Sequence, residues 1–181
     1  MNIIETDRLI LRLWRESDAE AFYRINSDEK VIEFLPGPLT MQQVTDFMAV
    51  MNQQWQERHY TLWAAEEKAS GKLAGFIGLS WLDLSPVAKP AVEIGWRLGS
   101  EFWGRGLATE GAMAAKEWGF QECGLDEIVA ITVPANLRSQ RVMTKLGMQR
   151  NPDADFAHPR LPADHRLSQH ILFAVQKSCI R

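Results

Sequence analysis

The hydrophobic pattern of the first sixty residues predicts one strand followed by two helices. Residues 8–13 form a leucine-rich run that suits a strand. Residues 17–20 have the Ser-x-x-Glu spacing of a capping box, which predicts a helix reaching about residue 26. Residues 40–43 (Thr-x-x-Gln) open a second helix, whose hydrophobic residues recur every three or four positions at Val44, Phe47, Met48, Met51 and Trp55. That stripe predicts a helix packed against a core.

The middle of the chain has strand-like spacing and then changes to helical spacing. Residues 60–66 and 73–82 predict two strands joined as a hairpin through Ser70-Gly71. Residues 91–98 predict a further strand. From residue 108 to 123 small and aromatic residues share one helical face, which predicts a helix.

The last third of the chain predicts a buried strand, a short helix and a final strand. Residues 127–133 are largely apolar and rich in β-branched residues, as in a central strand. Asn136 caps a predicted helix that ends at Gly147, and residues 170–176 form the last predicted strand. This order indicates an α/β fold, a mixed sheet with helices on its faces. No composition shift marks an internal boundary, so residues 1–181 are expected to form a single domain.

Composition and charge exclude several classes of partner. The 181 residues carry a formal net charge of −3, with 20 basic and 23 acidic side chains. No run of the sequence supplies the basic face that nucleic-acid binding requires, so no nucleic-acid partner is expected. The longest apolar stretches, such as residues 73–82, fall short of the roughly 20 residues of a membrane-spanning helix. No membrane partner is expected either.

The cysteines and the N-terminal residues predict a cytoplasmic location. Cys123 and Cys179 lie far apart without a Cys-x-x-Cys motif, which is typical of reduced thiols. Glu5, Asp7 and Arg8 interrupt the stretch that a signal peptide would need to be apolar.

The segment with the clearest chemical signature is EIGWRLGSEFWGRGLATEGA, residues 93–112. It combines a strand, a turn with glycines at 104 and 106, and the start of a helix. Glycines let the backbone turn sharply, and the free N–H groups and dipole of a helix start favour a phosphate. The segment therefore predicts an anion cradle, with a plain strand-to-helix turn as the alternative.

Two nucleotide motifs fail at this turn. A phosphate-binding Walker loop would need GxxxxGK followed by Ser or Thr, which is absent. A dinucleotide fingerprint would need a third glycine where Thr109 stands, and an acidic residue after the next strand, which ends at Val133-Pro134. Coenzyme A (CoA) is the remaining possibility.

Three motifs connect the chain to a known family. They are ETDRL at residues 5–9, GRGLATE at 104–110, and NLRS at 136–139 followed by LGM at 146–148. In combination they resemble the GNAT family of acyl-CoA N-acyltransferases, and within it the RimJ/RimL-like branch of ribosomal-protein N-terminal acetyltransferases. Trp103 stands where the wider family often has Gln or Arg, but an aromatic residue is ordinary there in this branch. The resemblance covers nearly the whole chain.

The resemblance implies a fold, a reaction and partners. The implied GNAT fold is a mixed, mostly antiparallel sheet of about six or seven strands, with helices on both faces and a splayed strand pair that holds the cofactor. The implied reaction is direct transfer of acetyl from acetyl-CoA to a primary amine, either a protein N-terminus or a small molecule. The implied protein is a monomer or a homodimer and needs no metal.

The resemblance also implies a set of cofactor-binding residues. These lie on the strand that starts at Glu93, on the glycine turn and on the helix that Asn136 caps. They are Trp96, Arg97, Leu98, Trp103, Gly104, Arg105, Gly106, Leu107, Ala108, Thr109, Asn136 and Ser139.

The implied catalytic groups are a base and an acid. Glu93 stands where many GNAT enzymes carry a catalytic or water-positioning carboxylate, and its alternative is a solvent-facing glutamate at a sheet edge. Asp155 and His158 are rival bases, because related enzymes can place the base after the second motif. Ser139 is the candidate acid for the leaving thiolate, or else part of a capped first turn.

Two further segments are expected to frame the acceptor. Residues 151–166 contain three prolines and predict a semi-rigid loop over the site. The spacing of His158, His165 and His170 fits no compact zinc motif. Residues 31–38 are expected to form the other wall, where Glu33 would attract a cationic amine.

Two other functions remain open at this level. The first is a non-catalytic acyl-CoA-binding or sensor module, in which the cradle binds but no transfer occurs. The second is a protein-interaction domain in which the glycine turn is only structural.

Overall fold

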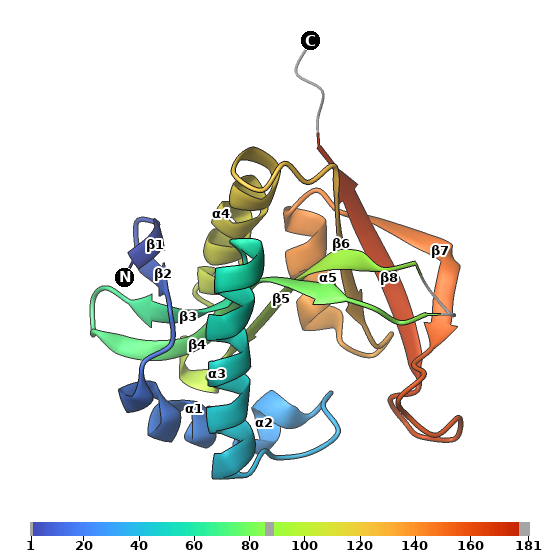
Figure 1. Ribbon diagram of the computed structural model, residues 1–181. Helices are drawn as coiled ribbons and strands as arrows, with labels where there is room; N and C mark the ends of the chain where they lie inside the picture. The colour runs from blue at the N-terminus through green and yellow to red at the C-terminus, as the bar shows by residue number, and fades with distance from the viewer. Residues whose placement is uncertain (1, 86–88, 178–181) are drawn as a thin grey trace.

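The computed structural model describes residues 2–85 and 89–177, and within these ranges eight strands form one mixed sheet (Figure 1). The strand order is β1-β2-β3-β4-β5-β6-β8-β7, and every neighbouring pair is antiparallel except β5 and β6. The strands are β1 (Asn2–Glu5), β2 (Leu9–Arg12), β3 (Leu62–Glu67), β4 (Lys72–Leu82), β5 (Ala91–Leu98), β6 (Glu127–Thr132), β7 (Gln149–Ala157) and β8 (Gln169–Gln176). The predicted class is confirmed, with one or two strands more than expected.

Helices cover both faces of this sheet, as predicted. They are α1 (Ala19–Ile25), α2 (Glu29–Ile32), α3 (Met41–Arg58), α4 (Leu107–Gln121) and α5 (Leu137–Lys145), with short 3-10 turns η1 (Glu16–Asp18) and η2 (Ser100–Phe102). Figure 1 shows the N-terminal strands at one end of the sheet and β6, β8 and β7 at the other. No helix in the described part of the chain is long and apolar enough to cross a membrane.

Two separate hydrophobic cores fix these helices to opposite faces. Phe22 of α1 and Val44 of α3 pack on Phe76 of β4 in one core. Ala112 of α4 and Met143 of α5 belong to the other core, which contains the largest group of buried side chains. Side chains alternate along a strand, so β4 presents Phe76 to the first core and Ile77 to the second, and β5 presents Ile94 to the second.

One predicted helix start is confirmed and another is wrong. Thr40 Oγ1 accepts from the Gln43 N–H at 3.2 Å, and the Gln43 side chain accepts from the Thr40 N–H at 2.8 Å, which completes the capping box. Ser17 does not cap α1. Asp18 occupies that place, and its carboxylate accepts from the Arg15 N–H and the Arg12 side chain instead.

The segment predicted as a loop over residues 151–166 is partly a strand. Residues Gln149–Ala157 form β7, which is the last strand of the described sheet, pairs with β8 and has an irregularity between Asn151 and Phe156. Pro152 lies within that irregularity, where the ladder does not need its missing N–H. β7 is mostly exposed and polar, so it lacks the hydrophobic alternation that marks a buried strand.

The sheet opens between its two parallel strands. β4 and β5 pair along the whole of β5, from Gly75 opposite Leu98 to Leu82 opposite Ala91. β5 and β6 pair at a single position, Glu93 opposite Val129. Beyond Glu93 the two strands diverge, as expected for a splayed pair. The backbone of β5 therefore has free hydrogen-bonding groups on its β6 side.

Candidate active site

A cleft of about 760 Å³ lies at this opening. It is lined by strand residues from β5 and β6, by the turn before α4, by the start of α5, and by residues of the α2 region and β8. The predicted residues that line it are Glu93, Trp96, Arg97, Leu98, Trp103, Gly104, Gly106, Leu107, Ala108, Thr109, Asn136, Ser139 and His158. Arg105 and Asp155 are not among its lining residues.

The register of the strands divides the cleft into two sides. Gly78 lies opposite Gly95, and Phe76 lies opposite Arg97, so these residues share the sheet face covered by α1 and α3. Glu93 is on that same face by alternation. The turn before α4 and the start of α5 belong to the other face. The cleft therefore reaches both faces through the gap between β5 and β6.

The glycine turn has the backbone that the predicted cradle requires. Gly104 and Gly106 have φ values of 72° and 79°, a left-handed conformation that side-chain-bearing residues rarely adopt. Gly106 is the N-terminal cap of α4 and provides no side chain. The first N–H groups of α4, from Leu107 onward, have no carbonyl one turn earlier to bind. These donors line the cleft and could hold an anion.

The opening sequence motif braces this turn. The Glu110 carboxylate in the first turn of α4 accepts from Thr6 Oγ1 at 2.6 Å and from the Arg8 N–H at 2.9 Å. Arg8 forms an ion pair with Glu110 at 2.6 Å and donates to the Arg105 carbonyl at 2.8 Å. Arg105 itself pairs with Glu67. The ETDRL and GRGLATE motifs thus meet in space, and the Arg105 side chain is directed away from the cleft.

Helix α5 presents a polar first turn and three cations near the cleft. Ser139 N–H donates to Asn136 Oδ1 at 3.2 Å, and Asn136 Nδ2 donates to Ser139 Oγ at 3.1 Å. Arg138, Arg141 and Lys145 also line the cleft, and the sequence reasoning missed them. Their spacing of three and four residues puts them on one helical face, which could have revealed them. They could neutralise phosphate groups.

Among the described residues that line the cleft, Glu93 is the only one with an acidic side chain. Burial raises the pKa of its carboxyl to about 7, although a hydrogen bond from the Ile131 N–H opposes that shift. A carboxyl with this pKa can gain and lose a proton near neutral pH, as a general base must.

The rival bases differ in where they lie. Asp155 is on the exposed strand β7 and pairs with Arg150 at 2.5 Å. His158 lines the cleft beside His170, with ring centroids 4.9 Å apart. Burial lowers the pKa of both imidazoles, so both are neutral at pH 7. His170 was not among the predicted site residues, because nothing in the local sequence shows that β8 begins at the cleft.

The expected attraction of an amine by Glu33 is not supported by its contacts. Glu33 forms an ion pair with Arg138 at 2.6 Å, and both side chains are about half exposed. Its neighbours Val31, Phe34 and Leu35 line the cleft and give that wall an apolar surface. The Arg138 guanidinium also lies 4.5 Å from the centre of the Trp103 ring.

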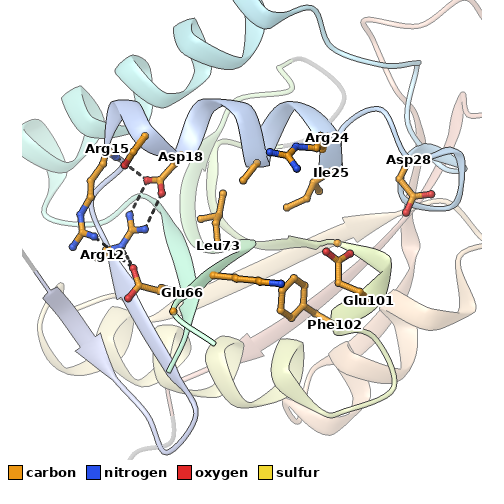
Figure 2. Close-up of a pocket in the computed structure, with 15 residues that line it drawn as sticks. Arg12, Arg15, Asp18, Arg24, Ile25, Asp28, Glu66, Leu73, Glu101 and Phe102 are labelled. Atoms are coloured by element: carbon orange, nitrogen blue, oxygen red, sulfur yellow. Dashed lines mark hydrogen bonds and ion pairs between the residues drawn. The ribbon is translucent and has the colours of Figure 1, made fainter. Parts of the chain in front are cut away.

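A second cavity of about 510 Å³ lies beneath α1 and is shown in Figure 2. Its dominant feature is Arg12, whose guanidinium pairs with Asp18 and Glu66, each at 2.7 Å. Burial alone would lower the pKa of Arg12, but hydrogen bonds to these two carboxylates outweigh it and raise the pKa. The charges of Arg12, Asp18 and Glu66 are paired with one another, so this cluster joins β2, η1 and β3 and has no free group for chemistry.

The described ranges contain no group of three or more His, Cys, Asp or Glu side chains that could hold a metal ion. Cys123 forms no disulfide within the described part of the chain, and Cys179 lies outside it. Burial raises the pKa of the Cys123 thiol, which makes it a poor nucleophile.

Comparison with known proteins gives consistent matches. A family model described as "Acetyltransferase (GNAT) domain" matches residues 8–149. The chain is 31% identical over 150 residues to the uncharacterized N-acetyltransferase YoaA of Bacillus subtilis, covering 82% of this chain and 83% of YoaA.

Two solved structures illustrate the likeness in fold. A GNAT-family acetyltransferase from Bacillus anthracis matches with a TM-score of 0.76 and 26% identity, over 96% of this chain and 97% of that one. A ribosomal L7/L12 alpha-N-protein acetyltransferase, RimL, in complex with coenzyme A matches with a TM-score of 0.77 and 17% identity. That match covers 97% of this chain and 98% of the RimL chain, and at this identity it concerns the fold alone.

Proposed function

Because the chain belongs to the GNAT acetyltransferase family, we propose that it is a cytoplasmic, single-domain N-acetyltransferase that transfers acetyl from acetyl-CoA to a primary amine. The observation that carries the proposal is the cleft itself. It joins the start of α4, which has no capping side chain and follows two left-handed glycines, to a partly buried carboxyl of raised pKa. An anion cradle and a general base in one cleft are what this reaction needs.

The residues around α4 and α5 would hold the cosubstrate. The N–H groups from Leu107 to Thr109 would bind the pyrophosphate, and Arg141 and Lys145 would neutralise phosphate charge. The free backbone groups of Trp96, Arg97 and Leu98 would pair with the pantetheine arm as a missing strand would. When bound, acetyl-CoA supplies an acetyl group activated as a thioester.

Glu93 and Ser139 would move the protons of the reaction. The amine nitrogen forms a bond to the acetyl carbon as the carbon–sulfur bond breaks. Glu93 would accept a proton from the amine, and Ser139 would donate its hydroxyl proton to the departing sulfur. The proton on Glu93 would return to Ser139 through solvent, which restores both side chains. The Ser139 oxygen already accepts from Asn136, which leaves its own hydroxyl proton free to donate. His158 and His170 are neutral and lie at the same cleft, so they are the alternative bases.

The RimJ/RimL-like branch remains part of the proposal, on the strength of the ETDRL, GRGLATE and NLRS motifs. The fold-level likeness to RimL agrees with it. In that branch the acceptor would be a protein N-terminus. A small amine is the other acceptor class, and the apolar wall formed by Phe34 and Leu35 is compatible with either.

A screen of primary amines with acetyl-CoA, followed by release of free CoA thiol, tests the proposal. The panel should contain peptides with free N-termini, amino acids, polyamines and aminoglycosides. We expect amine-dependent CoA release by the wild type and at least a tenfold slower release by Glu93→Gln. Glu117→Gln, an exposed glutamate on α4, is the matched control and should behave as wild type.

The screen also separates the rival functions. Tight acetyl-CoA binding without turnover on any amine would support a non-catalytic sensor module. Absence of acetyl-CoA binding in calorimetry would support a protein-interaction domain. Either result would contradict the proposed transferase.

A further inference from the structure

The charge of the cleft is strongly one-sided for an enzyme that would accept a cationic amine. Glu93 is its acid, and five cations line it within the described residues: Lys30, Arg97, Arg138, Arg141 and Lys145. Three of these cations lie on α5, on the side assigned to the cosubstrate. The side chains of Lys30 and Arg97 lie elsewhere in the cleft, and the proposed reaction gives neither side chain a role.

The Arg97 side chain lies on the sheet face covered by α1 and α3, whereas the glycine turn and α5, which would hold the cosubstrate, lie on the other face. Arg97 is opposite Phe76 in the β4–β5 register, and its guanidinium is 5.3 Å from the centre of the Phe76 ring. Its Nη1 donates to Asn26 Oδ1 in the α1 region at 2.5 Å. The backbone of Arg97 can still meet the cosubstrate, but the side chain points to the face covered by α1 and α3.

Arg97 is a partly buried cation without a counter-ion in the described part of the chain. Among residues 2–85 and 89–177 no carboxylate lies within ion-pair distance of it, and Asn26 is its single hydrogen-bond acceptor. A guanidinium has five N–H donors, so most of them remain for a ligand or water. Burial lowers its pKa to about 10, so the charge persists at neutral pH.

Asn26 is held in place for this contact. It is fully buried, and its Nδ2 donates to the Phe22 carbonyl at 2.7 Å. With Nδ2 held in this way, Oδ1 accepts from Arg97 Nη1 and holds one end of the guanidinium of a residue that lines the cleft. Arg12 differs from Arg97 in this respect, because the guanidinium of Arg12 forms ion pairs with two carboxylates, those of Asp18 and Glu66.

From this arrangement we propose that Arg97 binds a carboxylate of the acceptor, so that the acceptor is a small molecule carrying both a primary amine and a carboxylate. The inference rests on the proposed acetyl transfer. A carboxylate would supply the missing counter-ion and could accept two guanidinium donors at once. Leu62, Phe76 and Phe34 line the space beside it and favour an apolar body between the two groups.

The strand spacing sets the size of this acceptor. Gly95 lies between Glu93 and Arg97 on the same face, and neighbouring positions on one face are roughly 7 Å apart. An amine over Gly95, within reach of Glu93, would thus place a carboxylate at Arg97 in a molecule of amino-acid to dipeptide size. Polyamines and aminoglycosides carry several positive charges, which the cations that line the cleft would repel.

The test compares each carboxylate amine with its own amide. Free amino acids and short dipeptides are assayed beside their carboxamides with wild type, Arg97→Gln and Arg97→Lys. For the wild type we expect kcat/KM to favour the carboxylate by roughly tenfold or more. Arg97→Gln should lose that preference by raising KM for the carboxylate, Arg97→Lys should keep part of it, and KM for acetyl-CoA should stay unchanged in both.

Two further variants guard against a folding defect. Arg24→Gln changes an exposed arginine on α1, visible in Figure 2, and should keep the full preference. Asn26→Asp gives Arg97 an internal counter-ion and should abolish the preference without removing Arg97. The preference is a ratio measured within one protein, so a general loss of activity cancels.

The outcomes separate this inference from the proposed function. Turnover on amines with equal rates for carboxylate and amide, or a preference that survives in Arg97→Gln, would overturn the carboxylate site and leave the transferase proposal standing. No turnover on any amine would overturn both.

Discussion

Two charged residues on one face of β5 carry the chemistry proposed for the cleft. Glu93 has few polar partners, and burial brings the pKa of its carboxyl to about 7. Arg97, two positions further on the same face, keeps its charge because its pKa falls only to about 10. At neutral pH the base is therefore partly protonated while the cation is fully charged.

The pH dependence of catalysis should report Glu93. We expect kcat/KM to rise with pH and level off above about 7, because the base acts only when it is deprotonated. Glu93→Gln should lower kcat/KM by roughly a hundredfold and remove this rise. Steady-state kinetics from pH 5.5 to 9 measure both, with Glu117→Gln as control. A rise that persists in Glu93→Gln would assign the base to His158, His170 or water.

The stability of the protein should also depend on Glu93. A carboxyl whose pKa is higher in the folded state than in the unfolded state favours folding at low pH, and this contribution is lost as pH rises through about 7. Between pH 5 and 8.5 the free energy of unfolding of wild type should fall by up to about 3 kcal/mol more than that of Glu93→Gln. Urea unfolding at the two pH values measures the difference. Parallel pH dependences would show that the Glu93 carboxyl is not desolvated.

At the scale of elements, local chemistry explains why some segments could be predicted. The glycine turn, the Asn136 cap and the Thr40 box depend on residues close in sequence, and all three form as expected. β7 could not be predicted, because it is an exposed, polar strand at the edge of the sheet and lacks hydrophobic alternation. The ion pair of Asp155 with Arg150 likewise has no signature in the hydrophobic pattern.

The brace between the N-terminal segment and α4 is a similar case. The sequence predicts both motifs, but that Thr6 and Arg8 contact Glu110 follows from the fold.

The left-handed turn before α4 gives a sharp test of the cradle. Gly106→Trp should weaken acetyl-CoA binding by at least a hundredfold, because a side chain at its φ of 79° strains the turn and its Cβ would lie 3.5 Å from Arg8 Nη2, which braces that turn. Gly124→Trp is the matched control, since Gly124 also has a positive φ, of 65°, with open space where a Cβ would lie. Calorimetric titration compares the two variants. Equal affinities would contradict the cradle.

The Arg12 cluster in Figure 2 should control the docking of α1 on the sheet. Asp18→Ala leaves a buried guanidinium with one carboxylate fewer and should lower the free energy of unfolding by about 3 kcal/mol. Glu20→Ala removes an exposed ion pair with Arg24 and should change it by less than about 0.5 kcal/mol. Chemical denaturation measures both. A similar small effect of the two substitutions would refute a structural role for the cluster.

At the scale of the whole molecule, the cleft differs in charge from the chain around it. The protein has a formal net charge of −3, yet its cleft has five cations and one acid in the described part. Composition alone cannot reveal this difference, because β5, α2 and α5 contribute the cations from distant parts of the sequence. Strand register likewise brings Glu93 and Arg97 to one face, which the sequence could suggest only by alternation.

The central claim is that this cleft transfers acetyl from acetyl-CoA to an amine. Mass spectrometry of the amine, combined with measurement of free CoA in the same reaction, tests it most directly. We expect one acetylated amine for each CoA released by the wild type, and neither product above background with Gly106→Trp. Release of CoA without acetylated amine, or equal product formation by Gly106→Trp, would contradict the claim.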